Sequence, residues 1–510
     1  MFKKVLVANR GEIALRVMRT CREMGISCVA VYSDVDRAAI HVRYADEAYL
    51  LGSGAPKESY LNIERIIDIA RRCGAEAIHP GYGFLAENAA FVDACNAVGI
   101  VFIGPSSETM RIMGDKVAAR RLVASAGVPV VPGEDNVRTA LEALTAAERL
   151  GYPVLIKAVA GGGGKGIRVV HGVRDMEAAL SIAGSEAASA FGDHNLYIEK
   201  LLEPVRHVEV QFVADGAGNV LVFGERECSI QRRHQKLVEE SPSTALSPSQ
   251  RESMCSAAVT VARASGYANT GTVEFLLDAD GEFYFLEINS RLQVEHPVTE
   301  MISGMDLVAE QIRVAAGEGL SRRQEEIVLN GWALECRITA ENPYDDFLPS
   351  LGRVDYVSEP NGPGIRVDSA LYAGGELPYY YDPMVAKVIA WGRTRDEAIC
   401  RMRRALREFV VVGVDTNIPF HLQLLDDRRF LDGQIHTRFL DDFTMVPVEQ
   451  GDERKAALAV AAVLTHQKTN HRALATPTTE DGSRWRSAGR LAEARTTSWM
   501  RGPRWGRSTG

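Results

Sequence analysis

One stretch of the sequence, from Glu287 to Glu300, concentrates ionisable and amide side chains more densely than any other segment. At the spacing of a β-strand, five polar residues of this stretch, EINSRLQVEHPVTE, fall on one side, and on the other side only Ser290 and His296 are not plainly apolar. Taken alone, such alternation is typical of a half-exposed strand with a solvated face. The neighbouring sequence favours a binding site instead. The five polar residues are Glu287, Asn289, Arg291, Gln293 and Glu295.

The sequence before this stretch predicts a β-hairpin. The segments TVEFLL and FYFLEIN are rich in β-forming residues, and DADG between them is a turn sequence. With 279–282 as the loop, Glu274 lies opposite Glu287, and two carboxylates facing each other across a ladder repel. A hard divalent cation such as Mg²⁺, completed by Asn289 and by substrate phosphate oxygens, would turn this repulsion into binding. The prediction depends on the register, because a slip of one residue separates the carboxylates.

The amino-terminal elements predict a parallel α/β platform for such a site. Lys4 to Ala8 reads as a short strand, Glu12 to Met24 as a helix and Ser27 to Tyr32 as the next strand. The first turn carries Gly11 but lacks the other glycines of a dinucleotide-binding pattern, so NAD binding is disfavoured. We therefore predict a Rossmann-like unit over residues 1 to about 103.

Two features that follow could contact a ligand. The segment HPGYGFLAEN at 79–88 follows a third strand and places glycines and a proline around an aromatic residue, which indicates a shaped loop. A plain strand-to-helix turn that uses glycine for positive φ is the alternative. Lys116, near the start of a later helix, could meet a phosphate or remain a solvated lysine.

A glycine-rich hairpin is predicted between the strands Val154–Ala158 and Ile167–Val170. Its sequence, GGGGKG at 161–166, matches neither of the nucleotide-binding loops that open a helix, because a strand follows it. Its backbone N–H groups could close over phosphates, with Lys157 on the preceding strand as a point charge. A disordered linker is the alternative, which the regular strands on both sides disfavour.

The run RECSIQRRHQK at 226–236 is strongly charged, shows no apolar period and precedes Glu239 and Glu240. A solvated loop and a functional segment explain this pattern equally well.

The composition is that of an ordinary folded protein. The 510 residues, 46% hydrophobic and 25% charged, allow three or more packed units. A net charge of −9 disfavours a general nucleic-acid binder. Neither a membrane span nor a secretory signal is predicted, so we expect a cytoplasmic location. The eight cysteines contain no CxxC pair, which fits reduced thiols and disfavours a zinc site or a disulfide framework.

The last residues differ from the rest of the chain. From Gly451 onward there are 11 Lys plus Arg against 5 Asp plus Glu, a net of +6, whereas the first 450 residues carry −15. Apart from a short apolar helix candidate, Lys455–Leu464, residues 447–510 read as a basic, mostly disordered tail.

In combination, the motifs resemble the ATP-grasp superfamily and, within it, the biotin carboxylase component of biotin-dependent carboxylases. The matching segments are HPGYGFLAEN at 79–88, GGGGKGIRVV at 161–170, RRHQKLVEE at 232–240 and EINSRLQVEHPVTEM at 287–301. They occur in the family's order, and the resemblance spans residues 1 to about 446.

The resemblance implies a multidomain fold of mixed α/β and α+β class. Its parts would be a Rossmann-like (pre-ATP-grasp) amino-terminal domain at 1–113, an ATP-grasp domain at 114–330 with a mobile glycine-rich lid at about 131–203, a carboxyl-terminal biotin carboxylase domain at 331–446, and the tail at 447–510.

The resemblance also implies an activity: carboxylation of biotin through carboxyphosphate, with ATP, Mg²⁺ or Mn²⁺, and bicarbonate. The residues implied to hold ATP are Lys116, Lys157, Gly163, Gly164, Glu199, Lys200, Leu202, His207, Gln231 and His234. The implied metal ligands are Glu274, Glu287 and Asn289. The residues implied to contact bicarbonate or biotin are Lys236, Arg291, Gln293, Val294, Arg337 and Tyr82. Arg291, Glu295, Lys236 and Arg337 are implied to be catalytic, with Glu295 as the base.

The partners follow from the same resemblance. No Ala-Met-Lys-Met motif for biotinylation occurs, so we expect biotin on a separate carrier protein and a carboxyltransferase on another subunit. Arg16, Arg19 and Glu23 lie where the family builds its two-fold contact, which implies a homodimer, although they also suit a solvated helix face. The carboxyl acceptor stays open among acetyl-CoA, as in fatty acid biosynthesis, propionyl-CoA, pyruvate and other acids.

Two alternatives compete with this hypothesis. Another ATP-grasp ligase, joining a carboxylate to an amine, would share the metal and lid residues but would not need the row Arg291, Gln293 and Glu295. A catalytically silent nucleotide-binding protein is disfavoured because every catalytic-type position is occupied.

Overall fold

The computed structural model describes residues 1–137, 139–158, 167–191, 195–447 and 460. The chain divides into two units, Met1–Met445 and Val446–Gly510, and all named strands and helices lie in the first. The lid glycines Gly163 and Gly164 lie outside the described residues, as does the predicted tail helix apart from Val460.

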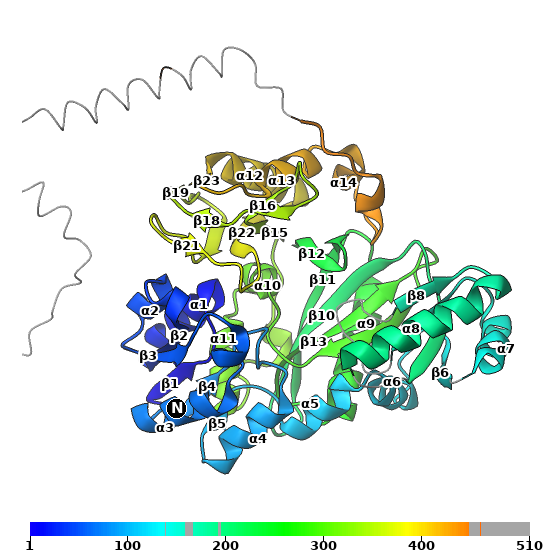
Figure 1. Cartoon of the computed structure of the whole chain (residues 1–510), viewed down its shortest axis with the longest axis horizontal. Helices are drawn as coiled ribbons and strands as arrows, with labels where there is room; N and C mark the ends of the chain where they lie inside the picture. Colours follow the sequence, from blue (N-terminus) through cyan, green and yellow to red (C-terminus); the bar gives the residue numbers. More distant parts are fainter. Residues whose placement is uncertain (138, 159–166, 192–194, 448–459, 461–510) are drawn as a thin grey trace, which may run out of the picture. The chain divides into compact units, whose positions relative to one another are not determined.

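A five-stranded parallel sheet forms the amino-terminal part and confirms the Rossmann-like prediction (Figure 1). Alternate residues of its central strand pack on opposite faces, Val5 and Val7 in one core and Leu6 in another, because helices cover both sides. In spatial order the strands are β3 Glu47–Gly52, β2 Ser27–Ser33, β1 Lys4–Val7, β4 Ala77–His79 and β5 Val101–Phe102. The main connecting helices are α1 Gly11–Glu23, α3 Ile63–Cys73 and α4 Ala89–Ala97.

A four-stranded antiparallel sheet carries the region predicted as the lid. Small buried side chains such as Ala143, Ala147 and Ala183 let two helices pack closely on it. Its strands are β6 Gly133–Val137, β9 Leu196–Lys200, β7 Val154–Ala158 and β8 Ile167–Val170, and its helices are α7 Ala140–Leu150 and α8 Met176–Phe191.

An eight-stranded antiparallel sheet is the scaffold of the candidate site. Pairing of Val238 with Cys336 continues this sheet across the predicted boundary at residue 330, so the strands of two predicted domains share one ladder. In spatial order the strands are β14 Phe283–Asn289, β13 Asn269–Leu277, β10 Arg206–Ala214, β11 Val220–Arg232, β12 Gln235–Ser241, β15 Trp332–Thr339, β22 Met384–Gly392 and β20 Ile365–Ser369. The helices α9 Pro248–Ala264 and α12 Arg395–Glu408 pack on it.

One of the two alternatives left open for the charged run in this sheet is wrong. The charged run 226–236 is not a solvated loop, because β11 extends to Arg232 and β12 begins at Gln235. Only Arg233 and His234 form the turn, both with positive φ. Arg226 itself is completely buried.

The remaining elements are short. The helices are α2 Ile40–Tyr44, α5 Ser107–Gly114, α6 Lys116–Ser125, α10 His296–Ser303, α11 Leu307–Ala315, α13 Ile418–Leu424 and α14 Arg428–Leu431. The strands are β16 Glu341–Asn342, β17 Leu348–Pro349, β18 Gly352–Arg353, β19 Tyr356–Ser358, β21 Glu376–Leu377 and β23 Val410–Val412. Among the helices of the described residues, none has both the length and the apolar character that a membrane span requires. All eight cysteines are described and are free thiols.

Candidate functional site

The hairpin of β13 and β14 brings the predicted metal ligands together. Glu274 pairs with Glu287 across the ladder, as predicted. The loop is longer than predicted, because Leu277 pairs with Phe283, and a bulge beside Glu274 restores the register. The Asn289 side chain donates a 2.9 Å hydrogen bond from Nδ2 to Glu274 Oε1. The three residues therefore form one cluster.

The donor set of this cluster fits a hard divalent cation. Two carboxylates and an amide offer the oxygen ligands that Mg²⁺ and Mn²⁺ prefer. Desolvation and the charge of Glu274 raise the pKa of Glu287, as expected for repulsion that is only partly compensated. Lys116 Nζ lies 3.7 Å from Glu287 Oε2 and supplies part of the compensation. Glu274, Glu287 and Asn289 are thus suited to hold the metal.

Beyond Asn289 the chain leaves the sheet, so the strand period ends midway through the stretch. The Arg291 guanidinium turns back and donates to Asn289 Oδ1 at 2.9 Å and to Gln293 Oε1 at 2.8 Å. Its Nε donates to Glu87 Oε2 at 2.9 Å, while Glu87 Oε1 accepts the backbone N–H of Ser290. Glu87, from the HPGYGFLAEN loop, therefore fixes Arg291 beside the metal cluster.

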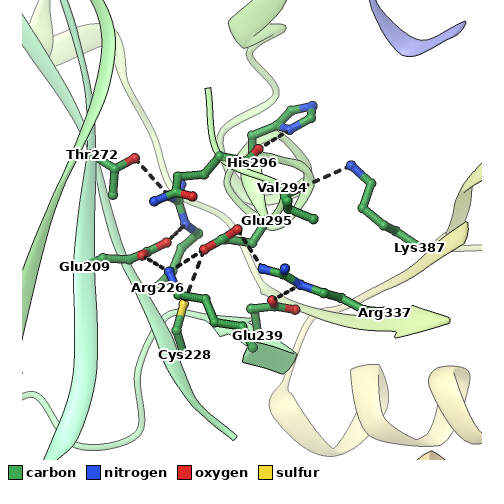
Figure 2. A network of polar contacts seen from close by, with 12 residues as sticks. Glu209, Arg226, Cys228, Glu239, Thr272, Val294, Glu295, His296, Arg337 and Lys387 are labelled. Atoms are coloured by element: carbon green, nitrogen blue, oxygen red, sulfur yellow. Dashed lines mark hydrogen bonds and ion pairs between the residues drawn. The ribbon is translucent and has the colours of Figure 1, made fainter. Parts of the chain in front are cut away.

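Glu295 lies completely buried between two cations (Figure 2). Its Oε1 accepts a hydrogen bond from Lys236 Nζ at 2.6 Å, and its Oε2 accepts one from Arg337 Nη2 at 2.9 Å. Burial alone would raise the pKa of Glu295, but Lys236, Arg337 and Arg226 lower it well below the ordinary value. The carboxylate is therefore ionised near neutral pH, as a proton acceptor must be.

Lys236 connects Glu295 to the cluster of predicted metal ligands. Its ammonium lies 2.6 Å from Glu209 Oε2, 2.9 Å from Glu274 Oε1 and 2.6 Å from Glu295 Oε1. Burial would lower the pKa of Lys236, but the three carboxylates hold it well above its ordinary value. The lysine therefore acts as a permanent positive charge that gathers carboxylates from three separate strands and loops.

The guanidinium of Arg226 forms a completely buried polar layer with Glu209 (Figure 2). Its Nε donates to Glu209 Oε1 at 2.6 Å, and its Nη atoms donate to Gln211 Oε1, Thr272 Oγ1 and Thr299 Oγ1 at 2.7 to 3.1 Å. These four hydrogen bonds provide partners for a charged guanidinium that has no access to solvent. Glu209 is thereby held in place to receive Lys236.

Arg337 and Val294 are positioned by further buried groups. Arg337 Nε donates to Glu239 Oε1 at 2.5 Å. Burial raises the pKa of Glu239 to about 7, with Arg337 opposing the shift. The Val294 carbonyl accepts a 2.9 Å hydrogen bond from Lys387 Nζ, which is completely buried (Figure 2). Arg337 and Val294 are thus held in position by buried residues that do not line the cleft.

Two of the predicted nucleotide residues, Lys157 and Lys200, lie on strands β7 and β9. Lys157 forms an ion pair with Glu199, and Arg120 Nη1 lies 3.7 Å from the same carboxylate. Lys200 Nζ donates to the backbone carbonyl oxygens of Gly151 and Tyr152 at 2.8 and 3.1 Å. Each lysine is thus held by its own partners, Lys157 by the Glu199 carboxylate and Lys200 by backbone carbonyl oxygens.

His207, another predicted nucleotide residue, contacts Glu274 of the predicted metal cluster. Its Nε2 lies 3.0 Å from Glu274 Oε2, and Gln231 Nε2 lies 3.0 Å from its Nδ1. Burial would lower the pKa of His207, but the charge of Glu274 raises it above the ordinary value.

One cleft of about 1250 Å³ gathers these side chains. Glu295 lies behind its wall, in contact with the lining residues Lys236 and Arg337. The predicted site residues that line it are Tyr82, Lys116, Lys157, Glu199, Lys200, Leu202, His207, Gln231, His234, Lys236, Glu274, Glu287, Asn289, Arg291, Gln293, Val294 and Arg337. Apolar residues that the sequence did not single out, Leu155, Ile167, Leu276 and Leu286, line the same cleft and suit a flat ring.

Of the three α1 residues expected at a two-fold contact, two are exposed and one is not. Arg19 and Glu23 are exposed. Arg16 is buried, with its Nη2 2.8 Å from Glu300 Oε1 and 2.9 Å from Asp306 Oδ1. The alternative of a solvated charge is therefore wrong for Arg16, because α1 turns this residue toward α10 and α11.

Three family models match the chain in succession. Residues 1–110 match the model described as biotin carboxylase, N-terminal domain. Residues 115–323 match the ATP binding domain of the carbamoyl-phosphate synthase L chain, and residues 335–442 match the biotin carboxylase C-terminal domain.

Similar proteins agree with these matches. "Biotin carboxylase 1" of Bacillus subtilis is 53% identical over 88% of this chain and 100% of its own length. The crystal structure of the biotin carboxylase domain dimer of Hydrogenobacter thermophilus 2-oxoglutarate carboxylase, in complex with MgADP, ADP and bicarbonate, is 49% identical. It superposes with a TM-score of 0.84 over 87% of this chain and 98% of that one. Pyruvate carboxylase of Rhizobium etli is 46% identical, with a TM-score of 0.82 over 87% of this chain and 40% of that longer one.

Proposed function

The chain belongs to the biotin carboxylase family, and from this membership we propose that it carboxylates biotin carried on a partner protein, using ATP and bicarbonate. The observation that carries the proposal is the meeting of two clusters in one cleft. One is the oxygen cluster of Glu274 and Glu287, and the other is the set of Arg337, Lys236 and the buried Glu295.

We assign the phosphates of ATP to the side of the cleft that carries Lys116 and Lys157, with the lid glycines and the residues of β9 around the nucleotide. A divalent cation on Glu274, Glu287 and Asn289 would neutralise the charge of the transferred phosphoryl group. Leu202, His207, Gln231 and His234 complete the proposed nucleotide pocket. This half of the site works by positioning and charge neutralisation.

Bicarbonate is assigned to Arg291, Gln293, the Val294 backbone and Lys236. A guanidinium presents parallel donors that suit a small planar anion. Glu295 accepts the proton of bicarbonate as its oxygen attacks the γ-phosphorus, and ADP leaves. Carboxyphosphate then breaks into CO₂ and phosphate, and the phosphate takes the proton from the ureido nitrogen of biotin. Arg337 stabilises the resulting enolate, which attacks CO₂, while Tyr82 contacts biotin.

The proposed assembly is a homodimer that works with a biotin carrier protein and a carboxyltransferase. The dimer of the Hydrogenobacter domain and the exposed Arg19 and Glu23 on α1 support the first part. The similar structures belong to pyruvate and 2-oxoglutarate carboxylases at nearly the same identity, so the acceptor is a property of the partner carboxyltransferase. Acetyl-CoA, with a role in fatty acid biosynthesis, belongs to the same set of proposed acceptors.

A direct test of the function is ATP hydrolysis by the purified chain. We expect phosphate release that requires Mg²⁺, bicarbonate and free biotin together, since each is needed for a complete turnover. Hydrolysis that requires an amine acceptor instead would support a carboxylate–amine ligase. Nucleotide binding without any turnover would support a catalytically silent protein. A coupled assay for ADP, with each substrate omitted in turn, separates the three outcomes.

Replacement of Glu287 by Gln is expected to weaken metal binding at least about tenfold, because it removes one of two opposed carboxylates. Electron paramagnetic resonance of Mn²⁺ titrated in the presence of ADP measures the affinity without turnover. Glu282→Gln, which changes an exposed carboxylate in the loop of the same hairpin, is the matched control. Equal Mn²⁺ affinity in the two variants would remove Glu287 from the ligand set.

A further inference from the structure

A second cavity, of about 290 Å³, lies beside the catalytic cleft. Its walls come from both ends of the first unit, with Val35 and Asp36 after β2 on one side and residues of 349–385 on the other. Apolar side chains such as Leu371 and Met384 dominate the carboxyl-terminal wall. The reaction assigned above uses none of these side chains.

Large apolar side chains of this cavity are exposed to solvent. Tyr379 is 70% exposed, Leu351 is 53% exposed and Val35 is 42% exposed. Exposed apolar residues that gather at a concave surface mark binding sites more often than residues scattered singly. Tyrosine is among the residues that are enriched at protein interfaces and at their hot spots.

Neighbouring contacts hold Tyr379 in place. Tyr381 Oη donates to Ser33 Oγ at 2.7 Å, and the Arg10 guanidinium stacks 4.1 Å from the Tyr381 ring centre. Tyr380 packs so closely on Gly54 that a Cβ there would approach its ring to 2.6 Å. The Tyr379 ring lies 4.1 Å from that of Tyr380. Two of three consecutive tyrosines thus anchor the segment and leave the third as a preorganised exposed ring.

The cavity and the catalytic cleft share a wall. Arg10, Gly11 and Glu12 line both, and so do the residues from Tyr381 to Met384. A protein that rests on Tyr379 therefore lies next to the cleft that contains Arg337.

We propose that this cavity and its rim form the docking surface for the biotin carrier protein. The inference rests on the proposed function, in which biotin arrives tethered to a separate protein. An apolar side chain of the carrier would enter between Tyr379 and Leu351 while the biotin ring enters the cleft. A carrier must leave again for the carboxyltransferase, and a small contact of this kind suits a transient complex.

The test compares carrier-bound biotin with free biotin as substrates of the full-length chain. We expect Tyr379→Ser to raise KM for the biotinylated carrier domain of the same organism about tenfold, as for loss of one exposed aromatic anchor. Turnover of free biotin should be unchanged, because Tyr379 lines the cavity and not the cleft. Tyr379→Phe should keep the wild-type KM for the carrier.

Val328→Ser is the matched control, since Val328 is also 70% exposed but does not line the cavity. An unchanged KM for the carrier in Tyr379→Ser would overturn the docking proposal. So would dissociation of a dimer by the same variant in sedimentation, because that result assigns the surface to a second copy of the chain. Absence of free-biotin turnover in the wild type would instead contradict the proposed function itself.

Discussion

Glu295→Gln is expected to lower bicarbonate-dependent ATP cleavage by about 10²- to 10⁴-fold, the range that a positioned general base contributes. The amide retains the shape of the carboxylate but cannot accept a proton from bicarbonate. Lys236 keeps Glu209 and Glu274 as partners, and Arg337 keeps Glu239, so the cations stay in place. ATP binding should therefore persist, because Lys236 and Arg337, which Glu295 contacts, are not among the residues assigned to ATP.

Two measurements separate loss of the base from loss of the fold. Calorimetric titration with ADP reports nucleotide binding, and phosphate release reports turnover. Glu310→Gln is the control, since Glu310 is also buried, at 3% exposure, but contacts the backbone of Ser321 away from the cleft. Unchanged turnover in Glu295→Gln would remove this residue from the mechanism.

The pH dependence of the wild-type enzyme provides a second check on Glu295. The pKa of Glu295 lies well below the ordinary 4.5, so the carboxylate is already ionised at pH 4.5 and becomes protonated only in stronger acid. A fall in kcat/KM between mildly alkaline and mildly acidic pH must then come from another group.

The hairpin that carries the predicted metal ligands could be predicted because the pattern that specifies it lies within one short stretch of sequence. Alternating polar residues and a turn sequence placed Glu274 opposite Glu287, although the loop is longer than predicted and a bulge corrects the register. The order of elements likewise predicted the parallel amino-terminal sheet.

Contacts between distant segments were not predictable in the same way. The segment around Arg226 is as polar as a solvated loop, and only Glu209, Thr272 and Thr299, contributed by other strands and a helix, explain its burial. Glu87 stood in a motif that suggested a shaped loop, but its bond to Arg291 spans 204 positions. The β-rich segments that precede and follow 226–236 were the local signal that could have identified β11 and β12 as longer strands.

Arg226→Met is expected to lower the free energy of unfolding by about 3–5 kcal/mol, the usual effect of removing one partner of a buried ion pair. The substitution keeps much of the side-chain volume but leaves Glu209 with one cation in place of two. It also leaves the hydroxyl groups of Thr272 and Thr299 without their guanidinium partner. Urea unfolding followed by circular dichroism measures the change.

The control is Arg313→Met. Arg313 forms an ion pair with Glu318, and the two side chains are 42% and 43% exposed. A surface pair of this kind contributes about 0–1 kcal/mol. The arginine at 226 also holds Glu209 for Lys236, so activity should fall in Arg226→Met even where the protein remains folded. Stability and activity both equal to those of Arg313→Met would mean that the buried layer neither supports the fold nor positions the catalytic lysine.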